Sequence, residues 1–368
     1  MSERTSMAAR QWVSLPGGSL DVRLGTDVID NASALLKGSV GRPRIAALAS
    51  GSDVDAELTE RVRRQLTDAG FEVTLVEVVA GPAALTLEAS GALFSQFAEM
   101  GLTADDLIVA VGDADVCSLA SYAATQWCAG TTLVTVPTTQ MGLVEAAVSP
   151  RPIGVGDSQA VLSVRTGVKH VLFDTDVVFG NVVPEDVLMS RVLMVVTAMC
   201  DSEKAFEHLW DHAEGLCAGD VETLCEQLRD TVKTRGKILS STALALRQSL
   251  AYGEAFARAL TCLDASIAPS TARAEALRFQ ARLAAGEGMF AVDDVLAQDE
   301  LLEMLELPMA QVSIAPDALI EAIRQERFKR SNRFLLGLPR KLGRVRLAAV
   351  TDELIAEHVA AWCASREG

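Results

Sequence analysis

Basic residues are scarce in this chain of 368 residues, which has 33 Lys and Arg against 49 Asp and Glu. The formal net charge is −16, so we expect neither nucleic acid nor an anionic membrane surface as a partner. Long apolar runs are lacking too, and the strongest, near residues 192–200, is too short to span a bilayer. The N-terminus shows no charged segment followed by an apolar stretch. We therefore expect a cytoplasmic protein.

Aromatic residues make up only 5% of the chain, while hydrophobic residues make up 49%. Such a composition favours well-packed globular domains in which Ala, Val and Leu pack helices on sheets. The seven cysteines are irregularly spaced, odd in number and without a CxxC pair. Reduced thiols are the expectation. No GxSxG or phosphate-binding P-loop motif occurs, and Cys117 has no visible base, so a buried inert thiol is favoured over a nucleophile.

Apolar strands alternate with helical periodicity through the first half. The pattern predicts strands at 20–24, 44–49, 71–78, 106–111 and 132–136. Helices are expected from a cap at Asp53 to Gly70, over 86–100, and over 117–127. This alternation indicates parallel βαβ units in an open sheet. From Pro184 onward the apolar spacing becomes helical almost to the end, so the chain divides into an α/β domain, 1–180, and an all-helical domain, 181–368.

Two strings in the first domain carry a resemblance to a known family. They are VPTT at 136–139, which closes a strand, and VLFDTD at 171–176. With the strand LIVAVG at 107–112, they resemble the 3-dehydroquinate synthase and sugar phosphate cyclase family. The resemblance implies a Rossmann-like parallel-sheet domain followed by an all-helical domain, an architecture shared with iron-dependent alcohol and glycerol dehydrogenases. It also implies NAD, a divalent metal and a biosynthetic lyase reaction that closes a carbocycle from a sugar phosphate.

The dinucleotide motif departs from the family pattern. Where the family has three glycines, this chain has Gly112-Asp113-Ala114-Asp115, and Leu85 stands at a family lysine. Two carboxylates beside a pyrophosphate would repel it unless a cation intervened. Gly112 remains the one candidate cofactor-binding residue, and an ordinary strand-to-helix turn explains it equally well.

The family's metal ligands, one Glu and two His, fall on Met194, Glu254 and Arg273, and Arg258 replaces a proton-transfer histidine. No histidine occurs between 213 and 357, so the sequence predicts neither a metal nor NAD at the family's sites.

The two histidines that are close in sequence are His208 and His212, in EHLWDH. At this spacing they share one helix face beside Glu207 and Asp211, a geometry that can hold zinc. Surface helices also carry such pairs by chance, and the family has no ligand here. A relocated metal site around Glu254 or around this pair stays an open alternative.

More of the family's anion-binding residues than of its metal ligands have a counterpart in this chain. The resemblance assigns substrate binding to Arg151, Lys233, Arg247 and Arg330, and a catalytic carboxylate to Glu145, with Lys233 and Glu254 as further catalytic candidates. Basic side chains of this kind can converge on a phosphate or carboxylate. The alternative is that each is solvated or ion-paired.

Three hypotheses follow. The first is a divergent family member that acts on or binds a small anionic metabolite without the family's metal- and NAD-dependent cyclisation. The second is a pseudoenzyme that pairs with an active paralogue or pathway enzyme. The third is a sugar phosphate cyclase with relocated metal ligands. Family members are commonly dimers, so the resemblance implies a homodimer or a heterodimer with a related protein.

Overall fold

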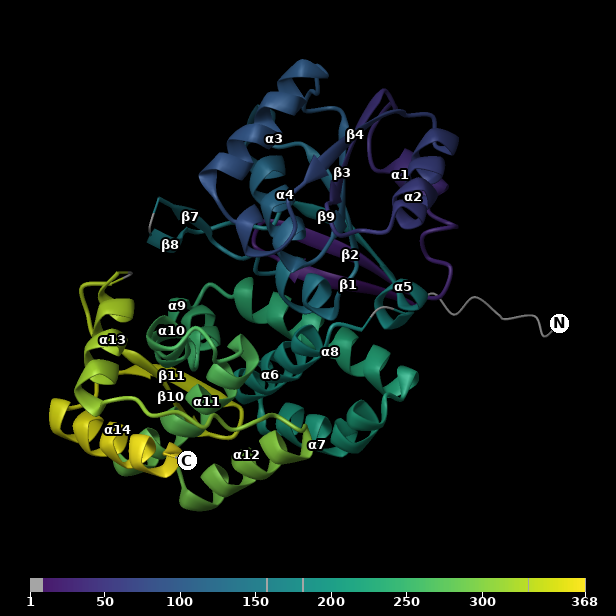
Figure 1. Ribbon diagram of the computed structural model, residues 1–368. Helices are drawn as coiled ribbons and strands as arrows, with labels where there is room; N and C mark the ends of the chain where they lie inside the picture. Colours follow the sequence, from purple (N-terminus) through teal and green to yellow (C-terminus); the bar gives the residue numbers. More distant parts are fainter. Residues whose placement is uncertain (1–8, 157, 181, 330, 368) are drawn as a thin grey trace. The chain divides into compact units, whose positions relative to one another are not determined.

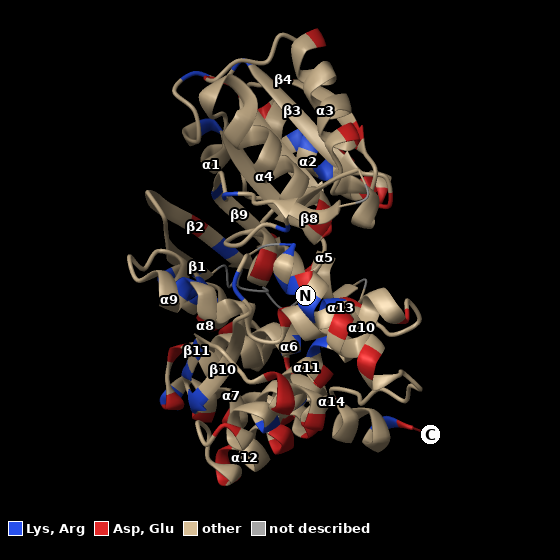
Figure 2. Ribbon diagram, turned by 90° about the vertical axis from the view of Figure 1, so that its left-hand side faces the viewer, with Lys and Arg blue, Asp and Glu red and all other residues tan. Residues whose placement is uncertain are grey.

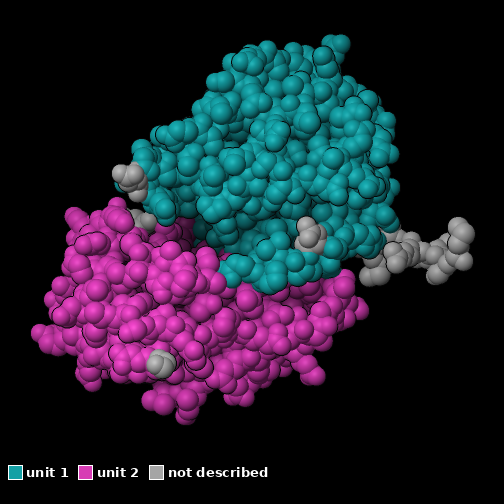
Figure 3. Space-filling model, in the orientation of Figure 1, with its two compact units in different colours: residues 1–186, 235–240 teal, residues 187–234, 241–368 magenta. Residues whose placement is uncertain are grey.

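The computed structural model describes residues 9–156, 158–180, 182–329 and 331–367. The chain forms two compact units, shown in different colours in Figure 3. Unit 1 comprises residues 1–186 and 235–240, and unit 2 comprises residues 187–234 and 241–368. None of the described helices combines the length and apolar composition that a membrane crossing requires.

A seven-stranded sheet forms the centre of unit 1. Its order is β1 (Ala9–Leu15), β2 (Gly18–Gly25), β9 (Val168–Asp174), β6 (Thr132–Pro137), β5 (Leu107–Gly112), β3 (Ile45–Gly51) and β4 (Glu72–Val78). From β2 to β4 all neighbours are parallel, which confirms the predicted open sheet. The antiparallel edge strand β1 was not predicted, because Val13 is its one buried residue and its apolar signal is weak.

Helices cover both faces of this sheet. Figure 1 shows α1 (Ser33–Gly38) and α2 (Ala56–Asp68) on one side and α3 (Leu87–Glu99) and α4 (Ala114–Gln126) on the other. Leu66 of α2 packs with Leu48 and Val109 of the strands in one hydrophobic cluster. Unit 1 also contains α5 (Thr175–Gly180), the short strands β7 (Ile153–Val155) and β8 (Ser158–Leu162), and a π-helical turn, Gly142–Ala146.

Two helix starts differ from the prediction. Helix α2 is capped by Asp55 rather than Asp53, since the Asp55 carboxylate accepts the N–H of Glu57 at 2.7 Å. Helix α4 begins at Ala114 rather than at Cys117, because Asp113 caps it. In both cases the capping aspartate decides where the helix begins.

The strand order places a switch point between β3 and β5. The chain runs from β3 outward to β4, then returns to β5 on the other side of β3 and continues to β6. Loops that leave the carboxyl ends of β3 and β5 therefore diverge, and in open parallel sheets ligands bind in the crevice at this point. The Gly112-Asp113 turn lies at this switch point.

Unit 2 is helical, as predicted. Its helices are α6 (Pro184–Asp201), α7 (Glu203–Ala218), α8 (Val221–Leu239), α9 (Leu244–Arg247), α10 (Glu254–Leu263), α11 (Pro269–Gly286), α12 (Val292–Met304), α13 (Pro316–Phe328) and α14 (Asp352–Arg366). The first residues of α6 and the last of α8 count with unit 1. In Figure 2 the ribbon is red at Asp and Glu positions, several of which lie around α12.

One feature corrects the all-helical prediction for this half. Strands β10 (Leu336–Lys341) and β11 (Arg344–Ala348) form an antiparallel hairpin in unit 2. Leu338 and Val345 are fully buried, and Gly343 has a φ of 75° in the connecting turn. The short alternation Arg-Val-Arg-Leu is the sequence signal for the second strand.

Candidate functional site

Asp113 occupies the N-terminus of α4 with its own carboxylate. One oxygen, Oδ1, accepts the backbone N–H groups of Asp115 at 2.9 Å and Val116 at 2.8 Å. The other, Oδ2, accepts the N–H of Gly81 at 3.1 Å, from the segment that follows β4. A helix N-terminus binds phosphate through such free amides. At this switch point the chain's own carboxylate already binds them.

Gly112 has a structural explanation. A Cβ atom at this position would lie 2.9 Å from Cβ of Val116, on the first turn of α4. The glycine therefore lets the helix start directly against the end of β5. This contact accounts for the residue without a bound cofactor.

Arg151 lies between two carboxylates. Its Nη1 donates to Asp115 Oδ1 at 2.7 Å and its Nε donates to Glu145 Oε2 at 2.6 Å. Its backbone N–H donates to Ser118 Oγ at 2.9 Å. Asp115, Glu145 and Arg151 thus form one charged cluster. Two of its members, Glu145 and Arg151, are site residues that the sequence resemblance predicts.

Burial sets the electrostatics of this cluster. Asp115 is only 4% exposed, and burial raises the pKa of its carboxyl above the ordinary value, although Arg151 opposes the shift. Burial alone would lower the pKa of Arg151, but the charges of Glu145 and Asp115 outweigh it and raise that pKa. Arg151 is therefore a permanent cation held by two acidic side chains. Burial also raises the pKa of the Cys117 thiol, in line with an inert cysteine.

A carboxylate of α6 binds the backbone of the loop that follows β6. Asp186, near the start of α6, accepts the backbone N–H of Gln140 at 2.9 Å and lies within reach of the Met141 N–H. Glu145 follows in the π-helical turn, and π-helical turns occur frequently at functional sites. The carboxylate that pairs with Arg151 is thus carried on a fixed, irregular backbone.

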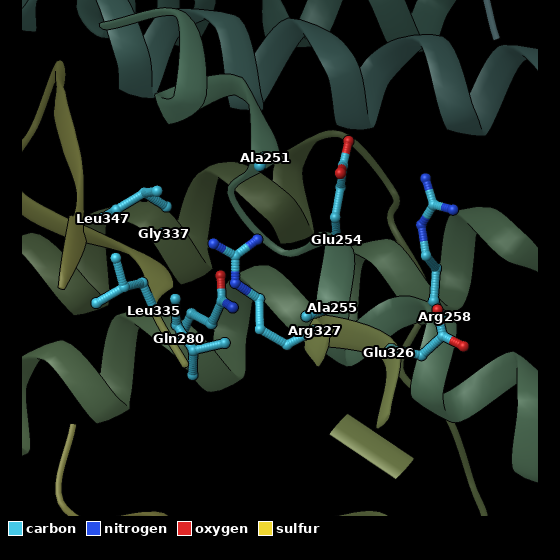
Figure 4. Close-up of a pocket in the computed structure, with 11 residues that line it drawn as sticks. Ala251, Glu254, Ala255, Arg258, Gln280, Glu326, Arg327, Leu335, Gly337 and Leu347 are labelled. Carbon is cyan, nitrogen blue, oxygen red and sulfur yellow. The ribbon is translucent and has the colours of Figure 1, made fainter. Parts of the chain in front are cut away.

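A second candidate site lies wholly within unit 2. It is a small pocket, shown in Figure 4, lined by Ala251, Glu254, Ala255, Arg258, Gln280, Glu326, Arg327, Leu335, Leu336, Gly337 and Leu347. We name it the α10–α13 pocket, after the helices that carry its charged residues. Glu254 and Arg258 are one helical turn apart on α10 and extend from it in the same direction (Figure 4).

Backbone geometry at the start of α10 positions the pocket. Gly253 has a left-handed φ of 85°, and its N–H donates to Gln280 Oε1 at 2.6 Å. The neighbouring Tyr252 is fully buried and donates its hydroxyl towards Gln298 Oε1 at 2.8 Å. These bonds tie the first turn of α10 to α11 and α12, so Glu254 is presented from a rigid turn.

Positive charge exceeds negative charge at this pocket. Glu254 Oε1 lies 3.8 Å from Nη1 of Arg273, and Glu326 Oε1 accepts from Lys329 at 2.5 Å. Each lining carboxylate thus has a cationic partner outside the lining set. Arg258 and Arg327 add two further guanidinium groups. Among the described residues that line the pocket or pair with a lining residue, the balance is positive.

The remaining predicted residues lie elsewhere or outside the described residues. Lys233 is exposed on α8, and Arg247 donates from Nη1 to the Ser241 carbonyl at 2.6 Å. Arg330 lies outside the described residues. Arg327 was missed by the sequence analysis, although its signal was present: it begins the basic run 327–330 at the end of a helical pattern.

Comparison with known proteins places this fold. Residues 75–178 match the family model described as 3-dehydroquinate synthase N-terminal. A 3-dehydroquinate synthase of Xanthomonas axonopodis pv. citri is 27% identical over 327 residues, which cover 85% of this chain and 88% of that protein. One from Caulobacter vibrioides is 23% identical and covers 92% of this chain and 95% of its own length. The chain is thus similar to 3-dehydroquinate synthases over most of its length, and residues 75–178 match the model of their N-terminal domain.

Solved structures of sugar phosphate cyclases share the fold of this chain. A 2-deoxy-scyllo-inosose synthase complexed with carbaglucose-6-phosphate, NAD+ and Co2+ aligns with a TM-score of 0.81 at 16% identity, covering 95% of this chain and 99% of that one. A 2-epi-5-epi-valiolone synthase from Streptomyces hygroscopicus subsp. jinggangensis with NAD+ and Zn2+ aligns with a TM-score of 0.78 at 17% identity, covering 96% and 99%.

The residues at the family's metal positions do not fit a divalent cation. Met194 is a buried thioether, a weak ligand for a hard or borderline metal. Arg273 carries a permanent positive charge, and that charge lies 3.8 Å from the one carboxylate of the set, Glu254. A guanidinium group therefore stands beside the carboxylate that a metal would need.

The dinucleotide turn does not fit a pyrophosphate either. The amides at the start of α4 are bound by Asp113, and Asp115 adds a second carboxylate in the first turn of that helix. Arg151, the cation that pairs with Asp115, also pairs with Glu145. A bound pyrophosphate would have to displace these contacts and meet uncompensated negative charge.

Proposed function

We propose that this 3-dehydroquinate synthase-like protein binds a small phosphorylated or carboxylated metabolite in the α10–α13 pocket, without the family's NAD- and metal-dependent cyclisation. The observation that carries the proposal is the presence of two guanidinium groups, Arg258 and Arg327, with the Gln280 amide in the lining of one pocket. A guanidinium recognises phosphate or carboxylate through two parallel N–H donors.

The pocket supports this class of ligand for two further reasons. Gln280 adds an amide side chain to the lining, and its Oε1 is held by the Gly253 N–H. Leu335, Leu336 and Leu347 supply apolar surface that would pack against the carbon skeleton of a small metabolite. An anion contacting Arg258 would also lie near the N-terminal turn of α10, where the helix dipole favours negative charge.

Within this proposal Glu254 is the carboxylate closest to a bound metabolite, and Arg273 supplies the positive charge that a metal would supply in the family's chemistry. Such a site can orient an anion and accept a proton from it, but it offers no hydride acceptor. The expected activity is therefore binding or a non-redox step on a sugar phosphate or a related carboxylate. A sugar phosphate analogue is the ligand named for the 2-deoxy-scyllo-inosose synthase structure.

Isothermal titration calorimetry tests the proposal with three probes: inorganic phosphate, glucose 6-phosphate and citrate. We expect saturable one-to-one binding of at least one probe by the wild-type protein. The variants Arg258→Gln and Arg327→Gln should each weaken it about 10- to 100-fold, the range for losing a charge-assisted hydrogen bond of about 1.5–3 kcal/mol.

Two matched variants serve as controls. The first is Arg324→Gln, at a position one turn before Arg327 on α13, and the second is Arg282→Gln, on α11. Both arginines pair with acidic residues outside the pocket. These variants should bind the probes like the wild type. The proposal fails if no probe binds, if the pocket variants bind unchanged, or if the protein takes up one equivalent of NAD+ tightly.

A further inference from the structure

Two histidines lie side by side on α7. His208 and His212 are four residues apart, and their ring centroids lie 4.1 Å from each other. Both side chains are half-buried. Neither belongs to the α10–α13 pocket or to the metal positions of the family, so their pairing calls for a separate explanation.

Helix α8 brings a carboxylate to the same place. The ligand atoms of His208, His212 and Glu226 all lie within 4.8 Å of one another. The sequence analysis had considered Glu207 and Asp211 as neighbours of the histidines, but the third ligand comes from the next helix. The turn between α7 and α8 determines which carboxylate lies beside the histidines, and sequence spacing does not reveal it.

The connection between α7 and α8 fixes their register. Gly219 ends α7 in the left-handed conformation, with a φ of 73°, and Asp220 caps α8 by accepting the N–H of Thr223 at 2.9 Å. Gly215 lets the helices approach closely, because a Cβ there would lie 3.0 Å from the Thr223 side chain. Glu226 then falls one turn further along α8, opposite the histidines.

Polar groups on α8 lie beside both imidazole rings. Gln227 donates its amide N–H to Thr231 at 3.2 Å, which turns its carbonyl oxygen towards His212 Nδ1 at 3.1 Å. That arrangement places a proton on Nδ1 and leaves Nε2 of His212 as a metal ligand. Asp230 Oδ2 lies 3.1 Å from His208 Nε2, so a second carboxylate of α8 lies beside the histidine pair.

We propose that His208, His212 and Glu226 bind a Zn2+ ion that joins α7 to α8. Two imidazoles and one carboxylate are a donor set that zinc favours, and three protein ligands leave a fourth position open. Tetrahedral bonds of about 2.0–2.2 Å put ligand atoms roughly 3.4 Å apart, so no pair of ligand atoms, all within 4.8 Å of one another, has to close by more than about 1.4 Å. Glu226 is exposed and free to make that movement.

The surroundings favour a cation. Helix α7 is rich in acidic residues, and its Glu207 and Asp211 each adjoin one of the histidines in sequence. The chain as a whole carries a formal charge of −16. The ion would act as a clamp between two helices, and the site stands independently of anion binding in the α10–α13 pocket.

The test uses full-length protein without a histidine tag, stripped with a chelator and titrated with Zn2+ against a chromophoric competitor. We expect one equivalent to bind and to raise the melting temperature. Co2+ in its place should give the visible absorption of a tetrahedral site. His212→Ala and Glu226→Gln should each weaken zinc binding about 10- to 100-fold or more, as loss of a ligand or its support does.

Controls separate this site from the proposed pocket. His358→Gln removes a histidine on α14, and Glu254→Gln removes the carboxylate at the pocket, and both should bind zinc like the wild type. Melting curves without metal establish that each variant folds. The inference is overturned if the wild type leaves zinc with the competitor, if His212→Ala and Glu226→Gln bind unchanged, or if Glu254→Gln abolishes uptake.

Discussion

The sequence resemblance assigns cofactor positions to the β5–α4 turn of unit 1 and to the start of α10 in unit 2, and these two regions differ in how their charges are balanced. In unit 1 the polar groups bind each other: Asp113 binds the helix amides, and Arg151 pairs with Asp115 and Glu145. In unit 2, Arg273 lies beside Glu254, and Arg258 and Arg327 line a pocket. One region has become a structural ion cluster, while the other has become a cationic pocket.

Removing Arg151 should break the cluster of unit 1 and give the largest effect. Arg151→Met leaves Asp115, 4% exposed, and Glu145 without their common cation. Loss of one partner from a buried ion pair costs about 3–5 kcal/mol, and we expect a fall of that size in the free energy of unfolding, measured with urea. Arg258→Met in the pocket should change it by only about 0.5 kcal/mol.

The double variant Arg151→Met/Asp115→Asn sharpens this test. Neutralising the buried carboxyl removes most of the uncompensated charge, so part of the lost stability should return. Equal losses for Arg151→Met and Arg258→Met would contradict the contrast between the two regions.

The fold and the family could be predicted from the sequence, because they depend on long apolar patterns and on strings such as VPTT at 136–139. The hairpin near 336–348 and edge strand β1 were missed, since each carries only a short alternation. The ion cluster could not be derived from pattern alone. Asp115, Glu145 and Arg151 come from α4, a π-helical turn and a loop, and tertiary packing unites them.

The other contacts that the sequence could not predict are those between side chains of different elements. The sequence showed that Arg273 and Glu254 replaced metal ligands, but only the structure brings the two within 3.8 Å. Similarly, the spacing of His208 and His212 was visible, whereas Glu226 depends on the angle at which α8 returns past α7. Local spacing predicts which residues share a helix face, and it does not predict what packs against that face.

Asp113→Ala should produce a medium effect in unit 1. It frees the amides of Asp115 and Val116 and the N–H of Gly81, and loss of a helix cap costs about 0.5–2 kcal/mol. We expect the upper part of that range, measured by urea unfolding. The control Asp55→Ala removes the exposed cap of α2, which accepts one N–H, and should cost less. A larger loss for Asp55→Ala would show that the contact with Gly81 contributes nothing.

The smallest effect is a pH dependence in the same cluster, where burial raises the pKa of Asp115 and Arg151 opposes that shift. The pKa of Asp115 is raised in the folded state above its ordinary value of 3.8. A folded protein then holds a proton that the unfolded chain has released, so this group's stabilising contribution is lost as the pH rises above that value. Asp115→Asn should remove this loss, and the difference in unfolding free energy, wild type minus variant, should fall between pH 4 and pH 7.

Asp106 provides a control of opposite sign. Burial would raise the pKa of its carboxyl, but hydrogen bonds from Arg44 and Thr103 outweigh burial and hold the pKa below 3.8. Its contribution is present above that value and is lost as the pH falls through the folded pKa. The difference between wild type and Asp106→Asn should therefore rise with pH over the acid range. Slopes of the same sign for the two variants would show that the pKa of Asp115 is not raised in the folded state, which would contradict the difference between Asp115 and the buried carboxyl of Asp106.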